Sequence, residues 1–139
     1  MLLNALRPDP FPWIGDYSEE SRLTSPTGRK LAIPLDEAFL LYDRRQALFL
    51  DARNASDYAA GHIAGALNVP VSEGEERLLQ VLDGVPDSTA IITYCDGNNC
   101  NLSKELAIMI EAFGFSTVHV LVNGWSVWKQ AGYPIEGAS

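Results

Sequence analysis

The chain has 139 residues, 47% hydrophobic and 20% charged, so it is long enough for one domain with a buried core and too apolar for a disordered protein. Its net charge of −8 disfavours nucleic acid and anionic membrane surfaces as partners, because both require clustered lysine and arginine. No apolar run approaches the roughly 20 residues of a membrane span, and the two cysteines are too few for a disulfide scaffold.

The first part of the chain is rich in proline and turn-forming residues, and we expect an irregular N-terminal arm over 1–30 before a single domain over 31–139. The arm lacks the basic start and the long apolar stretch of a signal peptide. Two interpretations stay open: an arm that lies across its own domain through Phe11 and Trp13, or the remainder of a membrane-anchored form cut downstream of its anchor. The compartment is open for the same reason, with the cytoplasm as the default.

Helix-like and strand-like patterns alternate along the rest of the chain. The expected elements are a helix at 34–46, strand at 47–52, short helix at 54–61, brief strand at 66–70, helix at 72–84, strand at 89–94, helix at 102–114, strand at 116–122 and short helix at 125–132. Continuously apolar strands that alternate with helices imply right-handed crossover connections. The predicted fold class is α/β, with a mainly parallel central sheet and helices on both faces.

Local signals support two of these helices. In the short helix at 54–61, Asn54 is expected to be the N-cap and Gly61 to end the helix. The helix at 34–46 carries acids early and arginines late, which suits the helix dipole. Its core-facing stripe comprises Leu35, Ala38, Phe39 and Tyr42.

The only two cysteines, Cys95 and Cys100, lie between the strand at 89–94 and the helix at 102–114. Ligands of parallel sheets bind beyond the carboxyl ends of the strands. Loop amides and a helix N-terminus at such a position lower a thiol pKa, so Cys95 is a candidate nucleophile. A structural pair, half of a metal site, a redox switch and a small buried hydrophobe are the alternatives for these residues.

A metal site is not expected. A zinc site that used both cysteines would also need His62 and His119, and the spacing of these four residues matches no zinc motif. Trp125 and Trp128 lie three residues apart on a short helix and are expected to pack in the core rather than bind a ligand.

Three separated stretches resemble the signature segments of rhodanese domains. LFLDARNASDYAAGHIAGALNVP (48–70) resembles the N-terminal signature, in which a strand ends in Asp-x-Arg and is followed by an acidic-aromatic pair and Gly-His-Ile-x-Gly-Ala. IITYCDGNNCNLS (91–103) occupies the place of the rhodanese strand and active-site loop. GFSTVHVLVNGWSVWKQAGYPIE (114–136) resembles the closing strand and the Gly-Trp-x-x-Trp-x-x-x-Gly-Tyr-Pro ending, so the match covers roughly 33–136.

The resemblance implies a rhodanese-like domain and a sulfurtransferase in which Cys95 takes a sulfane sulfur, forms a persulfide and passes the sulfur on. The partners implied are a small sulfur donor and a thiol or cyanide-like acceptor, without a cofactor. Cys100 is then either a resolving thiol or a bystander. Backbone amides of the active-site loop would surround the persulfide; this loop comprises Asp96, Gly97, Asn98, Asn99, Cys100, Asn101, Leu102 and Ser103. Residues implied to support the site are Asp51, Arg53 and His62.

The loop also departs from the family pattern. Asp96–Leu102 separate Cys95 from Ser103, which is about two residues more than usual in such a loop. The loop carries no arginine or lysine, and its only charge is that of Asp96. Lys104, at the start of the next helix, is the nearest cation in the sequence. We therefore expect a polysulfide or persulfide donor rather than thiosulfate.

Phosphatases with a related fold also have a longer loop, but they need an arginine six residues after the cysteine to hold three phosphate oxygens. That position is Asn101 here, so a phosphatase is excluded.

Two further functional hypotheses stay open. One is a non-enzymatic, rhodanese-like regulatory module whose arm or acidic face docks a protein partner. The other is a thiol–disulfide switch between Cys95 and Cys100.

Overall fold

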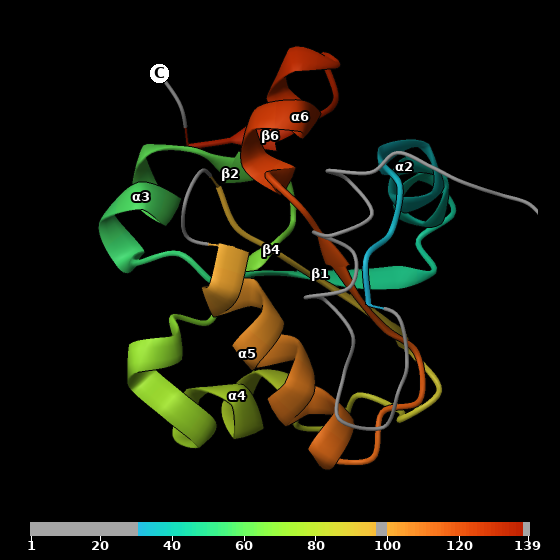
Figure 1. Ribbon diagram of the computed structural model, residues 1–139, viewed down its shortest axis with the longest axis vertical. Helices are drawn as coiled ribbons and strands as arrows, with labels where there is room; N and C mark the ends of the chain where they lie inside the picture. The colour runs from blue at the N-terminus through green and yellow to red at the C-terminus, as the bar shows by residue number, and fades with distance from the viewer. Residues whose placement is uncertain (1–30, 97–99, 138–139) are drawn as a thin grey trace, which may run out of the picture.

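The computed structural model describes residues 31–96 and 100–137 (Figure 1). For Cys100 it describes the backbone only. The expected N-terminal arm (1–30) and the middle of the expected active-site loop (97–99) lie outside the described residues.

The helices and strands alternate as expected from the sequence. In chain order they are α2 (Leu35–Asp43), β1 (Ala47–Asp51), α3 (Ala55–Ala60), β2 (His62–Ile63), β3 (Leu67–Asn68), the 3₁₀ helix η1 (Val71–Glu73), α4 (Gly74–Leu82), β4 (Ala90–Tyr94), α5 (Cys100–Ala112), β5 (Val118–Leu121), α6 (Gly124–Gln130) and β6 (Ile135–Glu136).

The central sheet has the strand order β3-β1-β4-β5, and each of its neighbouring pairs is parallel. The predicted α/β class with a mainly parallel sheet is therefore confirmed. The register aligns the strand ends, because Asp51 lies opposite both Asn68 and Tyr94, and Tyr94 lies opposite Leu121. The residues that follow β1, β4 and β5 consequently meet at one edge of the sheet, where ligands of such sheets bind.

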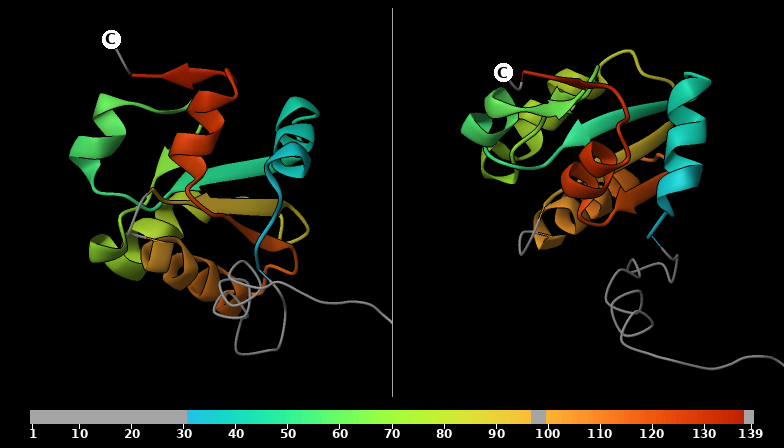
Figure 2. Two further views of the ribbon diagram at one scale, coloured as in Figure 1. Left: turned by 45° about the horizontal axis from the view of Figure 1, so that its top comes forward. Right: turned by 90° about the horizontal axis from the view of Figure 1, so that it is seen from above.

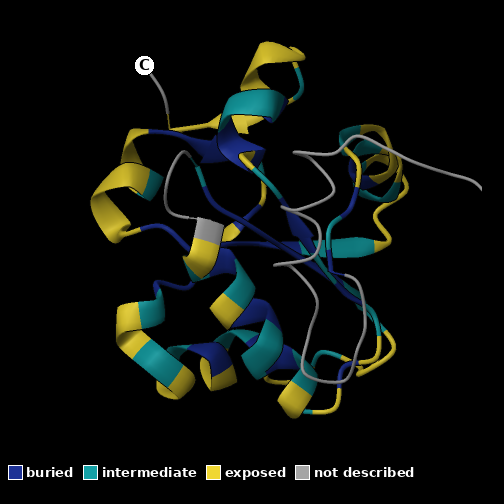
Figure 3. Ribbon diagram, viewed as in Figure 1, coloured by how far each residue is buried: buried dark blue, intermediate teal, exposed yellow. Residues whose placement is uncertain are grey.

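Helices cover both faces of the sheet, as predicted (Figures 1 and 2). On one face, α4 and α5 pack Leu78, Leu106 and Ile110 into a buried cluster. On the other face, α2 and α6 contribute Ala38 and Trp128 to a second cluster. Figure 3 shows the sheet as the most buried layer, with exposed residues on the outer sides of the helices.

The core between α2, β1 and α6 is aromatic. Trp128 is fully buried, and its ring centre lies 4.9 Å from that of Tyr42 and 5.5 Å from that of Phe49. The indole Nε1 donates a hydrogen bond to the carbonyl of Pro134 (2.8 Å), so the ring buries its polar edge with a partner. The expected packing role of Trp128 and the apolar stripe of α2 are both confirmed.

Three features differ from the expectations. An antiparallel pair, β2 with β6, was not predicted. The expected helix at 72–84 is divided into η1 and α4 because Gly74, at the junction, has a positive φ of 63°. Helix α5 begins at Cys100 instead of 102, so residues 100–103 are helical and do not belong to a loop. The first helical turn tolerates such polar residues, because its N–H groups have no partner within the helix.

No helix among 31–96 and 100–137 is long and apolar enough to cross a membrane. Among the side chains of 31–96 and 101–137, no three histidine, cysteine or acidic residues lie close enough together to hold a metal ion.

Candidate active site

Cys95 directly follows β4 at the carboxyl edge of the sheet, and the structure buries it completely. Its carbonyl accepts a hydrogen bond from the backbone N–H of Trp125 (3.2 Å). The Asp96 carboxylate accepts from both the backbone N–H (3.2 Å) and the hydroxyl (2.5 Å) of Ser126. The first turn of α6 is thus bound to Cys95 and to Asp96, the first residue of the expected loop.

Gly124 allows this close approach of α6. A β-carbon at this position would lie 2.5 Å from the Cβ of Tyr94, a distance that real Cβ atoms do not show. The residue before Cys95 therefore contacts the start of α6 directly, and this contact requires glycine.

Asp51 and Arg53 form a buried ion pair where β1 ends. Arg53 Nη2 lies 2.7 Å from Asp51 Oδ2, and Arg53 Nε donates to Asp51 Oδ1 (3.0 Å). Burial by itself lowers the pKa of Arg53, but the hydrogen bonds to Asp51 and its negative charge outweigh this and raise the pKa. The guanidinium is therefore charged throughout the ordinary pH range.

Arg53 also connects the pair to the next turn of the chain. Its Nη2 donates to the carbonyl of Gly61 (2.6 Å), and the guanidinium carbon lies 5.1 Å from the ring centre of Trp125. On the other side, the Asn68 amide donates to the carbonyls of Asp51 (3.1 Å) and Arg53 (3.0 Å). The chain after β1 is consequently held on both sides.

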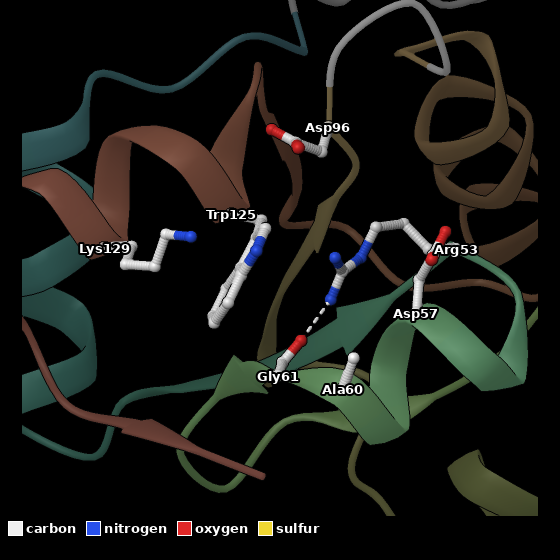
Figure 4. Close-up of a pocket in the computed structure, with 7 residues that line it drawn as sticks. All are labelled: Arg53, Asp57, Ala60, Gly61, Asp96, Trp125 and Lys129. Carbon is white, nitrogen blue, oxygen red and sulfur yellow. Dashed lines mark hydrogen bonds between the residues drawn. The ribbon is translucent and has the colours of Figure 1, made fainter. Parts of the chain in front are cut away.

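A cavity of about 380 Å³ opens beside these residues (Figure 4). Lys129, from α6, places its Nζ 5.1 Å from the ring centre of Trp125, on the side of the ring away from Arg53. Two cations therefore flank one indole ring at the edge of the cavity. The lining residues are Arg53, Asp57, Ala60, Gly61, Asp96, Trp125 and Lys129.

His62 points to a different part of the structure. Its Nδ1 donates to the Tyr58 carbonyl (2.7 Å), and its Nε2 lies 3.3 Å from Glu136 Oε1. Glu136 also accepts from the backbone N–H of Gly65, and this hydrogen bond, followed by His62, lowers the pKa of Glu136. His62 thus connects α3 to β6 and is not among the residues that line the cavity.

Tyr94, the last residue of β4, is fully buried, and its hydroxyl accepts a hydrogen bond from the buried Ile63 N–H (3.1 Å). Burial, and then the charge of Asp51, raise the pKa of Tyr94 well above its ordinary value of 10.0. Tyr94 therefore loses its proton at a higher pH in the folded protein than in the unfolded protein. The free energy of unfolding is unaffected by this difference below the pKa of the unfolded tyrosine, and it falls as the pH rises above that pKa.

We expect Tyr94→Phe to lower the free energy of unfolding by about 1–3 kcal/mol at neutral pH, because the Ile63 N–H loses its buried acceptor. Above pH 10 the difference from the wild type should shrink, because the tyrosine of the unfolded wild type ionises there. Urea unfolding of both proteins at neutral and alkaline pH measures this difference. A difference that stayed constant across this range would contradict the raised pKa.

The remaining expected site residues are distributed as follows. Ser103 is buried within α5, and its carbonyl accepts from the Thr93 hydroxyl (2.9 Å). Lys104 is also in α5 and is not among the residues that line the cavity. Asn101 and Leu102 belong to the first turn of α5, while Gly97, Asn98, Asn99 and the Cys100 side chain lie outside the described residues.

Sequence reasoning did not identify the cavity residues of α6. Trp125 was expected to pack in the core, and it is indeed mostly buried, but it also lines the cavity. Lys129 was not singled out at all. The closing Gly-Trp-x-x-Trp segment carries the available signal, because Trp125 and Lys129 are four residues apart and so share one helix face.

Comparison with known proteins identifies the family and the fold. A model of the Rhodanese-like domain family matches residues 35–131. The HTH-type transcriptional regulator Rv0324 of Mycobacterium tuberculosis is 37% identical over 102 residues, which cover 70% of this chain and 43% of that protein. Thiosulfate sulfurtransferase 16, chloroplastic, of Arabidopsis thaliana is 30% identical over 125 residues, which cover 84% of this chain and 97% of that protein.

Among solved structures, the crystal structure of thiosulfate sulfurtransferase from Pseudomonas aeruginosa aligns with a TM-score of 0.62 at 26% identity. The alignment covers 78% of this chain and 20% of that one. The chain thus spans less than half of the length of the Mycobacterium regulator and a small part of the Pseudomonas enzyme, whereas it matches nearly the whole Arabidopsis protein.

Proposed function

The chain belongs to the rhodanese-like domain family, and we propose that it is a sulfurtransferase that carries a sulfane sulfur as a persulfide on Cys95. The observation that carries the proposal is the position of Cys95. It lies at the carboxyl end of β4, and the next residue, Asp96, lines a cavity that also presents Arg53 and Lys129. Thiosulfate sulfurtransferases among the relatives support this class of reaction.

The proposed reaction has two balanced steps. The Cys95 thiolate attacks the outer sulfur of the donor, the sulfur–sulfur bond of the donor breaks, and its remaining part leaves with the electron pair and takes up the proton that Cys95 has lost. An acceptor thiolate then attacks the outer sulfur of the Cys95 persulfide, and Cys95 leaves as a thiolate. Neither step needs an external oxidant or reductant.

The cations of the cavity bear on the choice of donor. The absence of cations from the expected loop argued against thiosulfate, but Arg53 and Lys129 reach the cavity from outside that loop. Both thiosulfate and polysulfide therefore belong in the test.

The test is the intact mass of the reduced protein after incubation with each donor. We expect a gain of one sulfur, about 32 Da, that dithiothreitol removes. Fragmentation should locate the sulfur on the peptide that contains Cys95. A protein that gains no sulfur from either donor, or gains it on Cys100 alone, would rule out the proposal.

A rhodanese-like regulatory module is the second candidate. Two observations favour it: Cys95 has no exposed surface, and a relative at 37% identity is an HTH-type regulator. In that case the mass experiment gives no adduct. A third outcome, the loss of two hydrogens in the wild type but in neither single-cysteine variant, would indicate the thiol–disulfide switch between Cys95 and Cys100.

A further inference from the structure

Arg53 has hydrogen-bonding capacity that the protein does not use. A guanidinium has five N–H donors. Nε is directed at Asp51, and Nη2 serves both Asp51 and the Gly61 carbonyl. Nη1 has no hydrogen-bond partner among residues 31–96 and 100–137, although the Arg53 side chain is only 6% exposed. Arg53 is not among the described residues with a fully buried and unpaired side-chain atom, so Nη1 is open to the cavity, where a ligand or water can accept its hydrogen bonds.

These unused donors face the cavity. Arg53 lines it, and in Figure 4 the terminal nitrogen that does not bond Gly61 points into the space beside Trp125. The planar guanidinium presents N–H groups in a geometry that matches a carboxylate. Asp51 already balances the charge of Arg53. Arg53 would therefore bind a ligand through the direction of its N–H groups rather than through an excess of positive charge.

Lys129 supplies the uncompensated charge. In the described part of the chain it makes no ion pair, and its Nζ lies 5.1 Å from the centre of the Trp125 ring. The flat indole face restricts the position of the ammonium without neutralising it. An anion in the cavity would therefore meet a cation that has no competing carboxylate bound to it.

Two carboxylates also line the cavity, but neither cancels this preference. Asp96 accepts two hydrogen bonds from Ser126, so its negative charge is partly satisfied by the first turn of α6. Asp57 is an exposed residue of α3, so water screens its charge as it screens that of Lys129, and its attraction acts on Arg53, whose pKa it helps to raise. A ligand with a neutral or positive group in place of the carboxylate would leave both Arg53 Nη1 and Lys129 without an anion.

We propose that this cavity selects the sulfur acceptor, and that the acceptor is a small thiol that carries a carboxylate. The carboxylate accepts from Arg53 Nη1, and Lys129 is the specificity-determining cation. This inference rests on the proposed function, because the thiol of the bound acceptor attacks the outer sulfur of the Cys95 persulfide. The cavity is suitably placed, since Asp96 and Trp125 both line it and both adjoin Cys95, one along the chain and one through a hydrogen bond.

The experiment compares three acceptor thiols of similar size: 3-mercaptopropionate, 2-mercaptoethanol and cysteamine, which are negative, neutral and positive. The protein is loaded with polysulfide, and the persulfide is quantified by mass before an acceptor is added. The rate of sulfur removal at low acceptor concentration is then measured for the wild type and for Lys129→Gln. Each thiol is compared with itself between the two proteins, so differences in intrinsic thiol reactivity cancel.

We expect Lys129→Gln to slow transfer to 3-mercaptopropionate about fivefold at low salt, and to change transfer to 2-mercaptoethanol less than twofold. Added salt should reduce the wild-type preference, because Lys129 is exposed. Arg44→Gln is the matched control. It removes one positive charge from an exposed position at the end of α2, outside the cavity, and should leave the ratio of the three rates unchanged.

A binding measurement separates recognition from chemistry. Ligand-detected NMR of 3-mercaptopropionate with Cys95→Ser protein should show binding that Lys129→Gln weakens. Equal losses for all three thiols, unchanged transfer to 3-mercaptopropionate, or a preference for cysteamine would overturn the inference. A protein that never acquires the persulfide would instead overturn the proposed function, and the loading step reveals this before any acceptor is added.

Discussion

Replacing Cys95 by serine is expected to lower sulfur transfer at least about a thousandfold, because a serine hydroxyl is neither ionised nor nucleophilic enough to take up sulfur at neutral pH. The gain in mass with a sulfur donor should disappear in the same variant. Steady-state transfer to cyanide, measured with both polysulfide and thiosulfate, gives the size of the loss. Sulfur transfer that survived the substitution would place the chemistry on another residue.

The burial of Cys95 makes a second variant necessary. Because the side chain is fully buried, the serine hydroxyl can cost about 1–3 kcal/mol if it finds no hydrogen bond. Cys95→Ala removes the sulfur without burying a hydroxyl and should lose activity equally. Unfolding curves of the two variants then separate loss of the nucleophile from loss of the fold.

Cys100→Ser distinguishes the roles of the two cysteines. A single nucleophile at Cys95 predicts that this variant still gains one sulfur, whereas a resolving Cys100 predicts that the persulfide persists longer, because no second thiol attacks it. Loss of sulfur uptake in Cys100→Ser alone would contradict the assignment of Cys95.

The elements that were predicted well are those with a periodic apolar pattern. Strands β1, β4 and β5 are each short and mostly apolar, which is typical of strands covered on both faces. Helix α3 was predicted with its ends, since Asn54 accepts from the Asp57 N–H (2.8 Å) and Gly61 follows the last turn. These signals are local, so a single sequence contains them.

The β2–β6 pair could not be predicted, because it depends on a contact between distant segments. It joins His62–Ile63 to Ile135–Glu136, and each strand has only two residues. No periodicity can be recognised over two residues. The pairing is stabilised by tertiary contacts such as that between His62 and Glu136, which become visible only when the chain is folded.

The candidate site was predicted in part for a similar reason. The strand end alone indicated Cys95, whereas Asp51 and Arg53 were implied by the resemblance to rhodanese domains, and the register places Asp51 opposite the last residue of β4. The cavity, however, also needs residues of α6. The first turn of this helix is held at the sheet edge by the hydrogen bonds from Ser126 to the Asp96 carboxylate. In the sequence Asp96 counted only as a negative charge in the loop, because its partner Ser126 is 30 residues away. The cations that line the cavity, Arg53 and Lys129, lie outside the segment in which cations were sought.

The stability of this edge depends on the ion pair between Asp51 and Arg53. We expect Arg53→Met to lower the free energy of unfolding by about 3–5 kcal/mol, because it leaves a fully buried carboxylate without its cation. It also removes the hydrogen bond to the Gly61 carbonyl. Urea unfolding measures the loss, and Arg53→Lys should lose less, since it keeps the charge but not the fork of donors.

A double-mutant cycle shows whether this cost belongs to the pair or to Arg53 alone. Asp51→Asn removes the carboxylate charge that Arg53→Met leaves unpaired. The free energy of unfolding lost by the double variant should therefore be smaller than the sum of the losses of the two single variants, by more than about 1 kcal/mol. Strict additivity would mean that Arg53 stabilises the fold through Gly61 and Trp125 rather than through Asp51. Coupling would mean that Asp51 holds the guanidinium with Nη1 toward the cavity, so that Asp51→Asn should also weaken the binding of 3-mercaptopropionate. The ion pair would then contribute both to stability and to the geometry of the site.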